Sequence, residues 1–76
     1  MSENETWKNV GKRVRWLRRT HGLTIHQLAR GCGLSANAIS LVERGVNAPS
    51  VAGLEKFAKV LKVEVRELFT FEGKQR

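Results

Sequence analysis

The 76-residue sequence has one cysteine and one proline, lacks tyrosine, and holds seven acidic residues against fourteen lysines and arginines. A lone cysteine excludes an internal disulfide. No apolar run approaches the roughly 18 residues that a membrane-spanning helix requires. The first residues, MSENETWKN, are polar and include acids, unlike a secretion signal. We therefore expect one small cytoplasmic domain with no membrane partner.

The sequence offers little for metal or catalytic chemistry. Cys32, His21 and His26 have a spacing that matches no zinc pattern, so we expect Cys32 to be a small buried apolar side chain. No nucleophile lies beside a base, and neither an acidic pair nor a phosphate-binding loop is evident. We expect no enzyme activity, no cofactor, no metal and no small-molecule ligand.

The positive charge is concentrated near the N-terminus. The formal net charge is +7 and the isoelectric point is near 10.6. Six cations and no acid lie in one interval: Lys8, Lys12, Arg13, Arg15, Arg18 and Arg19. Such a field favours a polyanion, either nucleic acid or an anionic membrane surface. The alternative is a solvated basic face that only keeps the protein soluble.

The spacing of apolar residues predicts five short helices with short connections. The expected ranges are about 7–20, 24–31, 36–44, 51–61 and 64–69, with caps at Thr6, Thr24, Ser35 and Ser50 and glycine stops at Gly22 and Gly45. The expected core includes Val10, Val14, Leu17, Leu28, Ala29, Ile39, Val42, Val51, Leu54, Phe57, Ala58, Leu61, Val65, Leu68 and Phe69. We expect residues 1–6 to be a flexible N-terminus, 7–71 to be the domain and 72–76 to be a flexible tail.

A tight break separates the second and third helices. Gly31 and Gly33 lie two residues apart there, and a third helix capped by Ser35 follows. Two short helices joined by a short glycine-containing turn form a helix-turn-helix, here at about residues 24–44. The outward residues of the third helix are small or polar, which suits the DNA major groove.

Four segments in order, VGKRVRWLRRTHGLT, QLARGCGLS, ISLVERG and NAPSVAGLEKFAKVLKVEVREL, resemble the Cro/repressor-type helix-turn-helix family, also called the xenobiotic-response-element family. The resemblance covers about Val10 to Phe69. It implies an all-α, compact five-helix bundle like the lambda-repressor DNA-binding domain. It also implies a sequence-specific transcriptional regulator that binds double-stranded DNA, as a homodimer on a (pseudo)palindromic operator, with the third helix in the major groove. A phage-type repressor, a restriction–modification controller and an antitoxin-like autoregulator all fit.

The resemblance assigns two sets of DNA contacts. Base readout falls on Ala36, Asn37, Ser40 and Leu41, and phosphate contacts fall on Thr24, Ile25, Ser35, Arg44 and Asn47. Chemistry supports both sets, because helix N-termini attract anions and an asparagine amide pairs with adenine through two hydrogen bonds. Ile25 departs from the family, which often has glutamine at that position.

Three further expectations concern structure and partners. By resemblance, Arg18 and Glu43 form a structural ion pair that links the first helix to the end of the third. Trp16 either lies flat across its neighbours or marks a partner surface, and Phe71 is a candidate dimer contact. The competing function is a protein–protein interaction module using Trp16, Leu41 and Phe71, whose binding, unlike DNA binding, is insensitive to salt.

Overall fold

The computed structural model describes residues 3–71 and shows four α-helices followed by one turn of 3-10 helix. The elements are α1 (Glu3–Thr20), α2 (Ile25–Cys32), α3 (Ala36–Glu43), α4 (Val51–Leu61) and η1 (Val65–Phe69). Within residues 3–71 there is no β-strand, and no helix is long and apolar enough to cross a membrane. The all-α class is therefore confirmed.

The expected count of five α-helices is wrong. The fifth segment spans five residues, between Glu64 and Thr70, which both have extended backbone angles. So short a segment closes tight i→i+3 bonds but has no room to propagate an α-helix. It nevertheless buries Leu68 completely.

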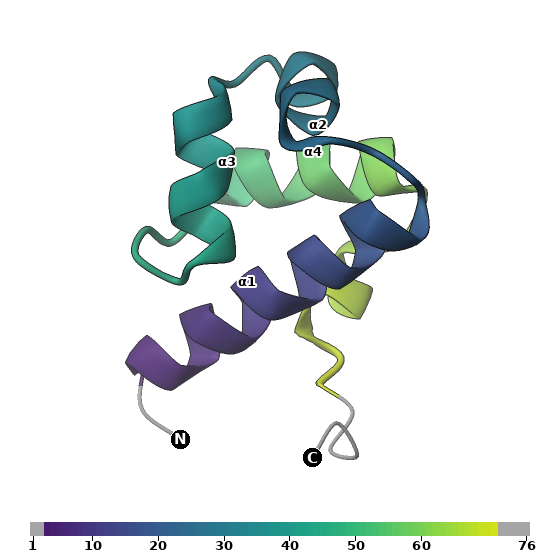
Figure 1. The fold of residues 1–76 in the computed structure, drawn as a ribbon. Coiled ribbons are helices and arrows are strands. Elements are labelled where there is room, and N and C mark those ends of the chain that lie inside the picture. The colour runs from purple at the N-terminus through teal and green to yellow at the C-terminus, as the bar shows by residue number, and fades with distance from the viewer. Residues whose placement is uncertain (1–2, 72–76) are drawn as a thin grey trace.

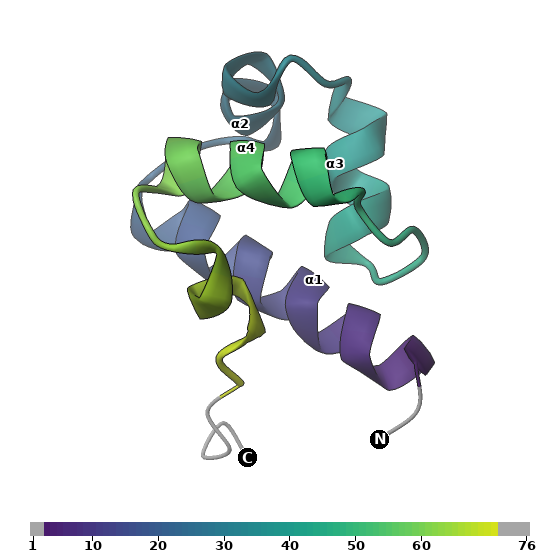
Figure 2. The same ribbon diagram turned by 180° about the vertical axis from the view of Figure 1, so that it is seen from behind.

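The helices form two sides around one core. Figures 1 and 2 show α1 and α3 on one side of the domain and α4 with η1 on the other, while α2 caps one end. The buried apolar residues are Val10, Val14, Leu17, Leu28, Ala29, Cys32, Ile39, Val42, Leu54, Phe57, Ala58, Leu61 and Leu68. Cys32 is buried as expected, and this burial raises the pKa of its thiol.

The first helix starts earlier than the sequence predicts. It begins at Glu3 rather than near Trp7, so residues 3–6 of the expected flexible N-terminus are helical. The carboxylate of Glu5 lies near the positive end of the helix dipole, which favours this extra turn. The Trp7 ring also packs edge-on against Phe69, with 6.1 Å between the ring centroids. Residues 1–2 and the expected tail, 72–76, lie outside the described residues.

The two glycines between α2 and α3 serve different purposes. Gly33 adopts a left-handed φ of 69° and caps α2, which only glycine does without a steric penalty. Gly31 lies against α4, where an added Cβ would come within 3.1 Å of a Val60 methyl carbon. One glycine therefore turns the chain, and the other lets α2 approach α4.

Three residues expected in the core are exposed. Val51 is 73% exposed because the buried face of α4 begins only at Gly53 and Leu54. Val65 and Phe69 lie on the outer side of the 3-10 turn, which directs only Leu68 fully inward. The expectation that these three residues are buried is wrong.

Candidate nucleic-acid interface

The third helix is held from below and open on its outer side. Ile39, Val42 and Glu43 are buried against the rest of the domain. Asn37 is exposed, while Ala36, Ser40 and Leu41 are half-buried. Since residues four apart lie on one helix face, Asn37, Ala36, Ser40 and Leu41 form a single outward surface, in which leucine is the one large apolar group. The structure thus brings together the residues that the sequence assigns to base readout.

The start of α3 is fixed by a side-chain cap. The Ser35 hydroxyl oxygen accepts a hydrogen bond of 3.0 Å from the Ala38 backbone N–H. A hydroxyl that accepts a bond keeps its own proton for donation. Ser35 therefore caps the helix and still presents an O–H group to an anion.

The start of α2 carries a complete capping box. The Thr24 hydroxyl accepts from the Gln27 N–H at 3.0 Å, and the Gln27 side chain accepts from the Thr24 N–H at 2.8 Å. Thr24 is exposed, as a phosphate contact requires. The Ile25 side chain is half-buried against the core and has no polar atom, so only its backbone N–H is suited to a phosphate. The phosphate contact predicted at Ile25 therefore stays a prediction for its backbone N–H group.

The far end of α3 leads into an exposed loop. Arg44 caps the helix and is exposed, and Asn47 lies three residues further on, also exposed. The backbone N–H groups of Val46 and Asn47 both donate to the Leu41 carbonyl, at 2.9 and 3.3 Å. These bonds hold the loop against α3, so Arg44 and Asn47 flank the outward surface at its C-terminal end.

A buried ion pair connects α1 to α3. The Arg18 guanidinium donates to both carboxylate oxygens of Glu43, from Nε at 2.6 Å and from a terminal nitrogen at 3.1 Å. The other terminal nitrogen donates to the Leu23 carbonyl at 2.9 Å. One side chain thus ties together α1, the turn after it and the end of α3. The predicted ion pair is present.

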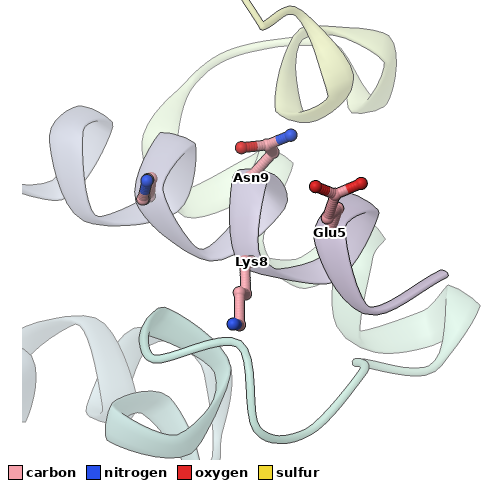
Figure 3. Close-up of a pocket in the computed structure, with 4 residues that line it drawn as sticks. Glu5, Lys8 and Asn9 are labelled. Carbon is pink, nitrogen blue, oxygen red and sulfur yellow. The ribbon is translucent and has the colours of Figure 1, made fainter. Parts of the chain in front are cut away.

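Backbone contact reinforces this junction. Gly11 packs so closely on the end of α3 that an added Cβ would lie 2.4 Å from the Val42 carbonyl oxygen. Figure 3 shows the preceding turn of α1, where Lys8 extends toward the loop that follows α3. The loop residue Gly45 lies against Lys8, since its Cβ would be 2.7 Å from the Lys8 Cα. Neither contact is predicted by a pattern in the sequence, since both join residues far apart along the chain.

Trp16 lies on the outer side of α1 and is 56% exposed. The Arg13 guanidinium stacks on its ring at 5.0 Å from the centroid, and Arg13 Nε also donates to the Glu67 carbonyl at 3.0 Å. Arg13 is therefore engaged with η1 and Trp16. Their three-residue separation in sequence was the available signal for this pairing.

The burial of the two C-terminal phenylalanines is the reverse of the prediction, which places Phe69 in the core and Phe71 at a surface contact. Phe71 is half-buried and packs on the core, whereas Phe69 is 39% exposed. Their ring centroids are 6.5 Å apart, and Phe69 also touches Trp7. Phe71 is thus a poor candidate for a free surface, and Phe69 is the outer ring of the group.

Known proteins share this architecture. The family model HTH_3, described as "Helix-turn-helix", matches residues 14–68. The HTH-type transcriptional regulator SlrR of Bacillus subtilis is 42% identical over 64 residues, which are 83% of this chain and 42% of SlrR. The chain therefore spans less than half the length of that curated relative.

Two solved structures are similar over most of the chain. The restriction-modification controller protein C.AhdI from Aeromonas hydrophila has a TM-score of 0.81 and 38% identity, covering 83% of this chain and 96% of that one. The biofilm master regulator SinR of Bacillus subtilis, solved in complex with DNA, has a TM-score of 0.74 and 33% identity. That match covers 78% of this chain and 95% of the SinR chain.

Proposed function

Because the chain belongs to the helix-turn-helix family HTH_3, we propose that it is a transcriptional regulator that binds double-stranded DNA sequence-specifically through α3. The observation that carries this proposal is the outward surface of α3. This surface is held by the core and by the Arg18–Glu43 pair, and it presents two small residues, one asparagine and one leucine. The curated relatives of the chain are regulators rather than enzymes, and the structure of one similar protein, SinR, was solved in complex with DNA.

The outer residues of α3 suit base recognition. The Asn37 amide matches the N6 and N7 atoms of adenine in the major groove. The Ser40 hydroxyl donates or accepts at several bases, and Ala36 and Leu41 offer apolar contact to a thymine methyl group. Discrimination at the position of Asn37 is expected to be worth about 1–3 kcal/mol.

Phosphate contacts flank this surface on both sides. At one side, the hydroxyls of Thr24 and Ser35 lie at helix N-termini, where unpaired backbone N–H groups and the helix dipole attract anions. At the other side lie Arg44 and Asn47. Such contacts fix the orientation of α3 in the groove without selecting a sequence.

The proposal includes a homodimer. Phe69 is an exposed apolar side chain beside Trp7 and Phe71, and Val65, on the same short helix η1, is exposed as well. Pairing two copies through this aromatic group would bury it and place two α3 helices on half-sites about one DNA turn apart. The operator would then be palindromic. The cytoplasm, where such a regulator meets DNA, is the proposed location.

Nuclear magnetic resonance tests the interface directly. We expect that titrating ¹⁵N-labelled protein with a mixed-sequence 20-base-pair duplex shifts the amide resonances of residues 24–26, 35–41 and 44–47 most strongly. Amides of the α4 outer face, at Lys56 and Lys59, serve as the internal control. A protein whose amide resonances do not shift with duplex DNA would contradict the proposal and favour the protein-interaction module.

A further inference from the structure

The segment proposed to enter the groove contains almost no positive charge. Between Leu34 and Gly53 the sequence has two charged residues. One is the cation Arg44, and the other is Glu43, which pairs with Arg18. Phosphate neutralisation supplies much of the affinity of a DNA-binding protein. The cations that provide it must therefore come from another part of the domain.

The first helix carries more basic residues than any other helix of the domain. Of its six basic residues, Arg18 is committed to Glu43, and Arg13 is engaged with Trp16 and Glu67. The other four are Lys8, Lys12, Arg15 and Arg19, and all four are exposed. The ion pairs Arg18–Glu43 and Arg66–Glu64 involve none of these four residues.

These four residues share one face of α1. Their spacings of four, three and four residues place them in a single stripe, here called the α1 basic stripe. At a rise of about 1.5 Å per residue, the stripe is roughly 16 Å long. Each DNA strand carries one charge per about 3.4 Å of helix axis, so the stripe has the length of several phosphates.

The stripe borders the side of α1 that contacts α3. Gly11 and Arg18 make that contact. Lys8 precedes Gly11 by three residues, and Arg15 precedes Arg18 by three, which puts both beside the α3-facing row. The core-facing residues Val10, Val14 and Leu17 lie on the other side of that row. Lys8 also extends toward the loop after α3 (Figure 3) and packs against Gly45. The stripe is thus continuous, through Lys8 and Gly45, with the Arg44 end of α3.

We infer that the α1 basic stripe is a second DNA-binding surface, which contacts the phosphates flanking the bases that α3 contacts. This inference rests on the proposed function. The stripe supplies sequence-independent affinity, while α3 supplies the choice of sequence. The two properties are therefore separable by mutation.

The test compares two doubly substituted variants with equal loss of charge. Lys8→Gln/Arg15→Gln removes two stripe cations, and Lys56→Gln/Lys59→Gln removes two exposed cations from α4, on the opposite side (Figure 2). Binding of a fluorescein-labelled mixed-sequence 24-base-pair duplex is measured by anisotropy in a series of potassium chloride concentrations. Melting by circular dichroism verifies that both variants fold.

A plot of log K against log[salt] has a negative slope. We expect its magnitude to be smaller by about 1.8 in the stripe variant, since each lost phosphate contact removes about 0.9. Its affinity near 0.1 M salt should fall more than about tenfold by the same relation. The α4 variant should retain the wild-type slope.

Equal slopes in both variants, or a stripe variant that binds like the wild type, would overturn the inference while leaving DNA binding intact. Binding to anionic lipid vesicles is measured in parallel. If the stripe variant lost this binding but bound the duplex like the wild type, the stripe would be a membrane-binding surface and the inference would be overturned. A wild-type protein that binds no duplex would instead remove the proposed function, and the inference with it.

Discussion

Arg18 and Glu43 together hold α3 in position, and their burial makes each dependent on the other. Removing one partner of a buried pair leaves an uncompensated charge, which costs about 3–5 kcal/mol. A domain of this size has a total stability of roughly 4–11 kcal/mol. We therefore expect Glu43→Ala to lower the melting temperature by more than about 10 °C, and to weaken DNA binding only through unfolding.

Arg66→Ala provides the control for that measurement. It removes the exposed ion pair with Glu64, in which both side chains are mostly in solvent, so the melting temperature should hardly change. A Glu43→Ala protein that melts like the wild type would show that the buried pair is dispensable.

The residues that the sequence located correctly are those with a strong local signal. Thr24 and Ser35 are predictable as N-caps, because a serine or threonine directly before an apolar helical pattern is a signal for a helix start, and the structure confirms both caps. Gly11 gave no such signal. Its role depends on the carbonyl of Val42, more than thirty residues away, and only the packing of α1 on α3 brings the two together. Close backbone approach between distant segments is not visible in one sequence.

Among the elements, α3 gives the sharpest separation of stability from binding. Aspartate is as good an N-cap as serine, so Ser35→Asp should leave the free energy of unfolding within about 0.5 kcal/mol of the wild-type value. It should nevertheless weaken duplex binding, because the new carboxylate would face the DNA phosphates. Both quantities are measured on one preparation by circular dichroism and by anisotropy.

Ser35→Ala is the complementary variant. It loses the cap, which costs about 1 kcal/mol, but introduces no charge. If Ser35→Asp bound duplex DNA as tightly as the wild type, the N-terminus of α3 would not lie near a phosphate.

The elements also show where sequence patterns stop being informative. The four α-helices follow from apolar spacing and caps, and each appears within a few residues of its expected range. The start of α1 and the nature of η1 did not follow, because helix ends depend on partners such as the Trp7–Phe69 contact. The same dependence explains why Phe69 is exposed and Phe71 is half-buried. The two side chains are identical, so the difference comes from how each packs against α1 and the core.

For the molecule as a whole, the aromatic group around Phe69 leads to a prediction about assembly. Phe69→Ser removes the exposed ring at the proposed dimer contact and should shift the protein toward monomer in sedimentation equilibrium. Trp16→Ser is the control, because it removes an even more exposed aromatic residue from the outer side of α1. A wild-type monomer, or equal dimer affinity in both variants, would contradict the proposed interface.

The central claim is that α3 selects a DNA sequence, and selection from a random duplex pool tests it most directly. The experiment uses the wild type and Asn37→Ala at two salt concentrations. We expect a palindrome to emerge for the wild type, with half-sites about one helical turn apart. Asn37→Ala should relax one position in each half-site and leave the others unchanged. Enrichment of no sequence by the wild type, even where it binds DNA at low salt, would contradict the claim.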